Sequence, residues 1–189
     1  MSQKFKKILF YSAHPKILWF KIRERIRCRF GTKNKIHKLD NLPIVKLQIA
    51  NNSVCNLIKV LNIYINNPSP MTISPNNLDM LHHEVSLGTE FYLAYDVNDF
   101  LIGVIGWQPW RNMVVNLVVD YKCRSKGFAM ACLNSLISLK KEQGVQKVNV
   151  QVYKKNLRAQ NLFFSLGFYF EKDMDKEFNV DYISLTLEI

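Results

Sequence analysis

The middle of the chain constrains the fold more than any other part of it. Residues 112–120 are nearly all apolar and predict a strand that is buried on both faces. Residues 127–142 follow with a helical pattern that Gly144 ends, and residues 148–152 alternate valine with polar side chains. A strand, a helix and a strand in this order predict a right-handed crossover whose two strands are parallel.

Strand and helix patterns also alternate on either side of this crossover. Further strands are predicted at 45–50, 90–95, 100–106, 168–171 and 181–187, and further helices at 54–65, 75–85 and 157–166. The flanking strand pairs are predicted to be antiparallel hairpins. We therefore predict an α/β (α+β) domain whose central sheet is mixed, mostly antiparallel and of about seven strands, with helices flanking it.

Local signals place two helix starts and one helix face. Ser53 is a suitable cap for the first helix, and Ser74-Pro75 predicts that the second helix begins with proline at its first position. The apolar spacing of the first helix predicts that one face is buried, formed by Leu57, Ile58, Leu61 and Ile65.

Charge divides the chain into a basic arm, residues 1–43, and one domain, residues 44–189. Residues 1–40 hold twelve of the 26 Lys and Arg but two of the 15 acids, within a net charge of +11. An amphipathic basic helix is predicted in the arm, with its apolar side formed by Trp19, Ile22, Ile26 and Phe30. Such an arm fits an anionic membrane surface, nucleic acid, its own domain or a second subunit in a homodimer. A solvated, weakly ordered arm is the simplest alternative.

Composition excludes several classes of protein. Hydrophobic residues make up 48% of the chain, enough for a core, and no apolar run approaches a membrane span. The four cysteines, Cys28, Cys55, Cys123 and Cys132, form no CxxC pair, so we expect neither a disulfide framework nor a metal site. We expect a cytoplasmic protein or one peripheral at a membrane, and rank organelle targeting lower.

A cationic loop between the central strand and the long helix carries the clearest chemical signal. Arg124 and Lys126 supply positive charge, and Gly127 and Ala129 keep the start of the helix low. The first N–H groups of a helix have no partners within it, so this corner fits a phosphate group. The loop matches neither a Walker loop nor a dinucleotide-binding fingerprint.

Two motifs in this region resemble those of one family. Arg124-x-x-Gly127-x-Ala129, at a strand-to-helix turn, matches the [RQ]xxGx[GA] motif of the GNAT N-acetyltransferase superfamily. Residues 156–168, NLRAQNLFFSLGF, are similar to its N-x-x-A-x-x-L-Y-x-x-x-G-F signature. Both stand on the expected elements and in the expected order, and the resemblance covers roughly residues 44–189.

The resemblance implies that acetyl-CoA or another acyl-CoA is the co-substrate. The main chain of Leu117, Val118 and Val119 would pair with the pantetheine arm. The pyrophosphate would bind to the amides of Lys126, Gly127, Phe128 and Ala129, together with Arg124 and Ser125. Asn156 would bind the pantetheine or orient a water, and the strands 112–120 and 147–153 should separate to admit the thioester.

Two departures from the family bear on catalysis. Phe163 stands where the family usually has a tyrosine that protonates the leaving thiolate, so water or a neighbour such as Tyr153 would have to replace it. The central strand also lacks a glutamate base. Its one interior polar residue is Asn116, which a core amide role would equally explain, and the nearest acid is Asp120, which also fits a solvated strand end.

Other candidates lie near the expected acceptor pocket. Trp107 and Trp110 fit either a substrate wall or the edge of the core. His82, His83 and Glu84 are predicted to lie mostly on the surface, since neighbours on a helix diverge by about 100°.

These observations predict an N-acetyltransferase that moves an acyl group from CoA to the amine of a small-molecule or macromolecular acceptor. A domain of the same fold that binds acyl-CoA without turnover, as a sensor or scaffold, is the first alternative. An acetyltransferase that docks on RNA or protein through the arm is the second.

Overall fold

The computed structural model describes residues 42–51, 53–68, 75–173 and 181–189. The strands are β1 (Lys46–Ile49), β2 (Glu90–Tyr95), β3 (Leu101–Gln108), β4 (Met113–Val119), β5 (Lys147–Tyr153), β6 (Tyr169–Asp173) and β7 (Tyr182–Glu188). The helices are α4 (Val54–Asn66), α5 (Leu78–Ser86), α6 (Phe128–Glu142) and α7 (Leu157–Ser165), with short 3-10 helices η1 (Pro109–Arg111) and η2 (Tyr121–Cys123).

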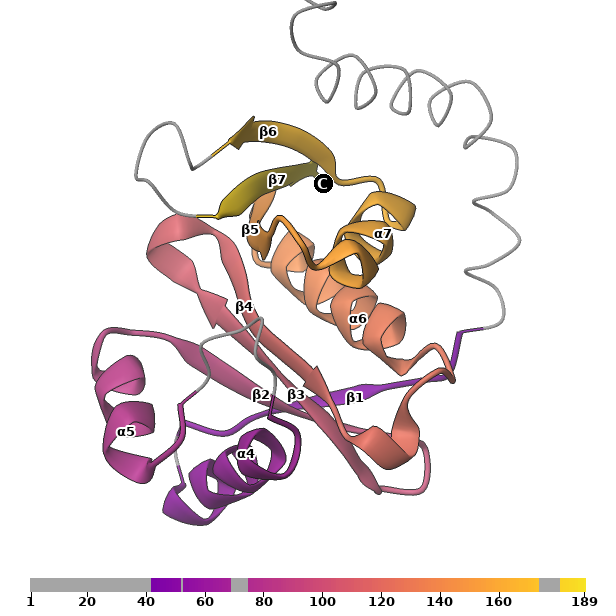
Figure 1. Ribbon diagram of the computed structural model, residues 1–189. Helices are drawn as coiled ribbons and strands as arrows, with labels where there is room; N and C mark the ends of the chain where they lie inside the picture. Colours follow the sequence, from indigo (N-terminus) through magenta and orange to yellow (C-terminus); the bar gives the residue numbers. More distant parts are fainter. Residues whose placement is uncertain (1–41, 52, 69–74, 174–180) are drawn as a thin grey trace, which may run out of the picture. The chain divides into compact units, whose positions relative to one another are not determined.

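Seven strands form one sheet in the order β1-β2-β3-β4-β5-β7-β6 (Figure 1). The pair β4 and β5, which α6 connects, is parallel, and every other neighbouring pair is antiparallel. The predicted mixed sheet and its crossover are therefore confirmed. The predicted basic arm lies outside the described residues except for its last two.

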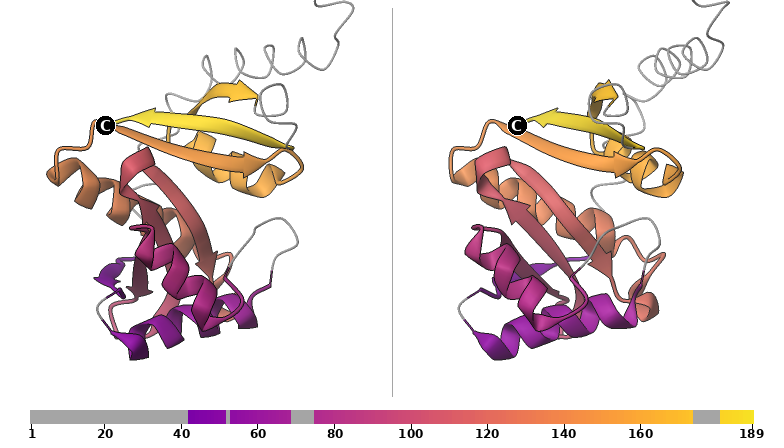
Figure 2. Two further views of the ribbon diagram at one scale, coloured as in Figure 1. Left: turned by 90° about the vertical axis from the view of Figure 1, so that its left-hand side faces the viewer. Right: turned by 60° about the vertical axis from the view of Figure 1, so that its left-hand side comes forward.

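Helices cover both faces of the sheet, as Figures 1 and 2 show for the strands β2 to β4. Successive residues of β2 point to two different cores. Tyr92 belongs to the core under α6 and α7, together with Leu136 of α6, whereas Phe91 belongs to the core under α4 and α5, together with Leu81 of α5. No described helix is long and apolar enough to span a membrane.

The buried face of α4 differs from the predicted one. Ser53 caps the helix as predicted, because its hydroxyl accepts the N–H of Asn56. Ile58 and Ile65 are exposed, however, and the side chains that α4 buries are Leu57, Val60, Ile63 and Tyr64. This helix is apolar on more than one side, so its periodicity did not determine which side faces the sheet.

The second helix begins later than predicted. Asn77, rather than Ser74-Pro75, starts α5, since its side-chain oxygen accepts the N–H of Met80 at 2.8 Å. Asparagine is among the best residues at this position because its short amide reaches back to the first turn. Pro75 therefore precedes the cap, and Ser74 lies outside the described residues.

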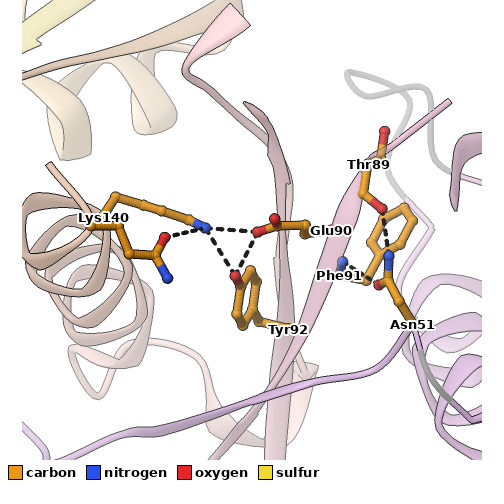
Figure 3. Close-up of polar contacts among 7 residues, drawn as sticks. Asn51, Thr89, Glu90, Phe91, Tyr92 and Lys140 are labelled. Carbon is orange, nitrogen blue, oxygen red and sulfur yellow. Dashed lines mark hydrogen bonds and ion pairs between the residues drawn. The ribbon is translucent and has the colours of Figure 1, made fainter. Parts of the chain in front are cut away.

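A buried lysine ties the end of α6 to β2 (Figure 3). The side chain of Lys140 is 3% exposed, and its ammonium group donates to Glu90 at 2.7 Å, to the Tyr92 hydroxyl at 3.0 Å and to Gln143 at 3.0 Å. The rings of Tyr92 and Trp107 each lie 5.3 Å from it. Three acceptors match the three donors of an ammonium group, which offsets the loss of water around this charge.

Candidate active site

The first two residues of β4 pair with the middle of β5, and the two strands then separate. The paired residues are Met113 with Asn149 and Val114 with Val150. Beyond them β4 runs on to Val119, and β5 to Tyr153, without further pairing between the two strands. The parallel strands therefore diverge, as the family resemblance implied, and main-chain groups on their facing edges are left for another partner.

A β-bulge interrupts the pairing of β4 with β3 just beyond the point where β4 stops pairing with β5. Val115 and Val118 pair with residues only two apart on β3, so Asn116 and Leu117 both lie opposite Ile105. Asn116 has a φ of 51°, in the left-handed region that residues other than glycine rarely adopt. One extra residue bends a strand and reverses which face its later side chains reach. Val114 and Leu117, three residues apart, accordingly pack on the same core.

Tyr64 of α4 contacts this bulge from the face of the sheet that α4 and α5 cover. Its hydroxyl donates to the main-chain oxygen of Asn116 at 3.3 Å. Burial, with a smaller effect from the charge of Glu84, holds the pKa of this phenol well above its ordinary value. The hydroxyl therefore keeps its proton and remains a donor near neutral pH.

Two glycines of β3 allow β4 to approach closely on both sides of the bulge. A Cβ atom at Gly106 would lie 2.7 Å from the Val115 Cγ2 atom, and one at Gly103 would collide with the main-chain oxygen of Val118. Larger residues would therefore push the bulged strand away. These two glycines carry no motif, and sequence analysis did not single them out.

The loop from β4 to α6 contains two residues with left-handed main-chain geometry. Ser125 has a φ of 63° and Gly127 a φ of 84°, with Lys126 between them. Left-handed residues are common in loops whose main-chain N–H groups bind an anion. α6 follows with Gly127 as its cap residue and no capping side chain, whereas Ser53, Asn77 and Asn156 cap the other three described α-helices.

The last two residues of the predicted arm, Leu42 and Pro43, lie next to Gly127. A Cβ at Gly127 would lie 3.3 Å from the Pro43 Cδ atom and 3.5 Å from the Leu42 Cδ2 atom. Phe128 and Ala129, which begin α6, are half-buried, whereas the side chains of Ser125 and Lys126 are exposed. The residues of this predicted cradle thus lie together at one corner of the sheet.

Arg124 is held against the end of β4. Its Nε donates to the main-chain oxygen of Val119 at 3.1 Å, and its Nη2 donates to the side-chain oxygen of Asn67 at 3.0 Å. Asp120 caps η2, since its carboxylate accepts the N–H of Lys122 at 2.9 Å. Asn67 was missed by sequence analysis because it lies just beyond the predicted helix 54–65, directly before Pro68, and belongs to no motif.

The second motif forms the turn into α7. Asn156 caps this helix by accepting the N–H of Ala159 at 3.1 Å. Phe163 is buried with its ring edge-on to Phe168, at 5.2 Å between ring centroids. Tyr153 ends β5, half-buried. Its ring centroid lies 5.6 Å from that of Tyr182.

The remaining candidates separate into core and surface. Trp107 is 2% exposed and packs in the core beside Lys140, so of its two predicted roles the structure supports the core role. Trp110 is 54% exposed on η1, and His82 and His83 are exposed on α5. Within the described ranges, no three His, Cys, Asp or Glu side chains are grouped to hold a metal ion.

Burial makes two thiols poor nucleophiles. Desolvation raises the pKa of Cys132 to about 12. Desolvation, with the negative charge of Asp120 second, also raises the pKa of Cys123. Since the thiolate is the reactive form, neither residue fits covalent catalysis.

A known protein family matches the part of the chain that contains these features. The sequence profile described as the acetyltransferase (GNAT) family matches residues 57–168, which include the bulge, the cationic loop and both motifs. The chain belongs to the GNAT acetyltransferase family. No curated protein sequence matches the chain.

Solved structures share the fold of this GNAT domain. They include mutant forms of the spermidine/spermine N-acetyltransferase SpeG from Vibrio cholerae (TM-score 0.61, 16% identity, covering 76% of this chain and 93% of that one). A spermidine N-acetyltransferase from the same organism, in complex with CoA and spermine, is also similar (TM-score 0.58, 15% identity, 76% and 95%). A dodecameric structure from that organism gives a TM-score of 0.59 at 17% identity, with 76% and 93% covered. At these identities the likeness establishes the fold.

Proposed function

We propose that the protein is an acetyl-CoA-dependent N-acetyltransferase that modifies an amine. The observation that carries this proposal is the early end of pairing between β4 and β5 beside an uncapped α6. The first feature offers strand edges to an extended amide-containing arm, and the second offers N–H groups to a diphosphate. Together they fit the two chemical halves of a CoA molecule. Membership of the GNAT family supports the same conclusion.

Each part of the site has a proposed role. The main chain of Leu117, Val118 and Val119 pairs with the pantetheine arm. The N–H groups of Lys126, Gly127, Phe128 and Ala129, with Arg124 and Ser125, bind the diphosphate. Asn156 and Phe163 line the pantetheine. When bound, acetyl-CoA supplies a thioester that an amine can attack directly.

A small group of residues could transfer protons during the proposed reaction. Phe163 carries no proton donor, so Tyr153 or water would protonate the leaving thiolate. Asn116, which lies in the bulge, and Asp120, just after β4, are the other polar candidates. Because the carboxylate of Asp120 already caps η2, a catalytic role for it would compete with a structural one.

The proposed acceptor is an amine. A panel of candidate amines that includes polyamines, each assayed for acetyl transfer, would identify it. The Vibrio cholerae neighbours are named for spermidine, and one is in complex with spermine. We also propose self-association as a homodimer or larger assembly, location in the cytoplasm, and contact of residues 1–40 with anionic lipid or nucleic acid.

Two glycine variants at opposite ends of α6 test the cradle. Gly127 and Gly144 have φ of 84° and 83°, so a side chain strains the main chain equally at both. We expect Gly127→Glu to abolish CoA binding in calorimetry through bulk and charge repulsion. Gly144→Glu, where a Cβ meets nothing within 4 Å, should bind CoA like the unmodified protein. A folded Gly127→Glu variant with unchanged affinity would refute the proposed cradle.

Binding without turnover is the second candidate function, and Phe163 favours it. Acetyl-CoA consumption across the amine panel separates the two candidates. Transfer to any amine above the uncatalysed rate supports the enzyme, whereas CoA binding with no transfer to any of them supports a sensor or scaffold.

A further inference from the structure

Asn67 joins two parts of the chain that lie more than fifty residues apart in sequence. It follows the last turn of α4, and its side-chain oxygen accepts two hydrogen bonds from the loop after β4. One comes from the main-chain N–H of Tyr121 at 2.8 Å and the other from the Nη2 of Arg124 at 3.0 Å.

The amide of Asn67 is buried and bonded on both sides. The residue is 5% exposed, and its amide nitrogen donates to the main-chain oxygen of Ile63 at 2.9 Å. A buried amide with hydrogen bonds at both ends is fixed in one orientation, because any rotation would leave polar groups unpaired. Its oxygen therefore offers Arg124 a fixed acceptor.

Arg124 is consequently held at two points. Asn67 binds one arm of the guanidinium, and the main-chain oxygen of Val119 binds the Nε at 3.1 Å. A guanidinium has five N–H donors, so others stay available for a ligand. Fixing this long side chain in advance removes much of the entropy that a phosphate contact would otherwise cost.

We propose that Asn67 is a positioning residue for CoA binding that acts through Arg124. This inference rests on the proposed function, because it takes the diphosphate of CoA as the group that Arg124 binds. Asn67 holds the guanidinium at the end of β4, next to the cradle that begins at Ser125. A substitution at Asn67 should therefore weaken CoA binding, although the side chain of Asn67 makes no contact with CoA in this proposal.

A double-mutant cycle tests this dependence. CoA affinity is measured by calorimetry for the unmodified protein, Asn67→Ala, Arg124→Ala and the double variant. We expect Asn67→Ala to weaken binding about 3- to 10-fold, and Arg124→Ala at least as much. The double variant should bind as Arg124→Ala does, within about twofold, because the proposal assigns the effect of Asn67 on the ligand to Arg124 rather than to the Tyr121 contact. Unchanged affinity in Asn67→Ala, or single effects that multiply in the double variant, would overturn the proposal.

Asn51 provides a matched control for general destabilisation. Its amide also bridges main-chain groups, donating to Thr89 at 2.7 Å and accepting the N–H of Phe91 at 2.8 Å, at the start of β2 (Figure 3). Asn51→Ala should lower the melting temperature and leave CoA affinity unchanged. If it weakens CoA binding as much as Asn67→Ala does, the effect is one of stability and the proposal fails.

A second variant covers the case in which Asn67→Ala does not fold. Asn67→Asp keeps an acceptor oxygen for Tyr121 and Arg124 and loses the donor to Ile63. It also places a negative charge against Arg124, which should bind the guanidinium more firmly and repel the diphosphate. We expect a folded protein with CoA affinity more than about tenfold weaker at low salt. A folded Asn67→Asp variant with normal affinity would overturn the proposal. If the unmodified protein binds no CoA, the proposed function itself fails, and the role of Asn67 falls with it.

Discussion

The ammonium group of Lys140 lies 2.7 Å from the carboxylate of Glu90 and is almost completely buried. Removing the carboxylate would leave this charge without its counter-ion. We expect Glu90→Leu to lower the free energy of unfolding by about 3 kcal/mol, measured by urea denaturation. The double variant Glu90→Leu, Lys140→Met should recover most of that loss, since no charge is then buried. A double variant less stable than Glu90→Leu would contradict this account.

Removing the Tyr64 hydroxyl should affect transfer more than CoA binding. Tyr64→Phe keeps the ring in the core but deprives the Asn116 carbonyl of its donor, at a cost of about 1 kcal/mol in stability. Because that bond holds the bulge beside the opening between β4 and β5 that is proposed to admit the thioester, we expect kcat to fall while CoA affinity stays within about twofold. Calorimetry and steady-state kinetics on the same preparation separate the two effects. An unchanged kcat would show that the bulge holds its shape without Tyr64.

Restoring a phenol at position 163 should preserve or raise the rate of acetyl transfer. Phe163→Tyr adds a proton donor on the turn of α7 where the GNAT signature carries tyrosine, and the packing against Phe168 can remain. The transfer rate is measured at saturating acetyl-CoA for each amine that is accepted. A large fall in rate in a folded variant would show that the site uses another geometry for the leaving group.

Alkaline pH should narrow the stability difference between the protein and its Cys132→Ala variant. Burial raises the pKa of Cys132 to about 12, whereas a thiol in the unfolded chain ionises at about pH 8.5. A raised folded pKa contributes stability below the unfolded pKa, and this contribution is lost as pH rises toward the folded value. Urea denaturation at pH 8 and pH 10.5 measures the difference, and a constant difference would indicate an accessible thiol.

The order of the elements and the crossover could be predicted because each depends on local patterns. Alternation along 148–152, the Gly144 stop and the apolar strand before Arg124 are all visible in one sequence. The two motifs also indicated the family from the sequence alone. The same reasoning placed the diverging strands correctly, although only as something that the family resemblance implied.

The bulge could not be predicted, because β4 is apolar along nearly its whole length. The bulge changes which side chains between Val114 and Leu117 face each side of the sheet. This change is not visible in the sequence when almost every residue is equally hydrophobic. The same ambiguity misassigned the buried face of α4, where Ile58 and Ile65 are as apolar as the residues that reached the core. Periodicity identifies a face only when the opposite face is polar.

Polar contacts between residues far apart in sequence were also not predicted. Asn67 and Arg124 are 57 residues apart in sequence, and sequence analysis placed Arg124 in the phosphate-binding loop without assigning any role to Asn67. Their pairing depends on how α4 packs under β4, which no short motif encodes. The same holds for Tyr64 and Asn116.

The separation of β4 from β5 also changes which amides the fold protects. Strands at the middle of a sheet ordinarily exchange their hydrogens most slowly. Here the ladder between them ends at Val114 and Val150, so the facing edges beyond that point resemble outer edges. Deuterium should therefore enter the centre of this sheet before it enters the hairpin of β2 and β3. A ligand that spans the opening would slow that uptake at the centre and make the interior the region most responsive to occupancy.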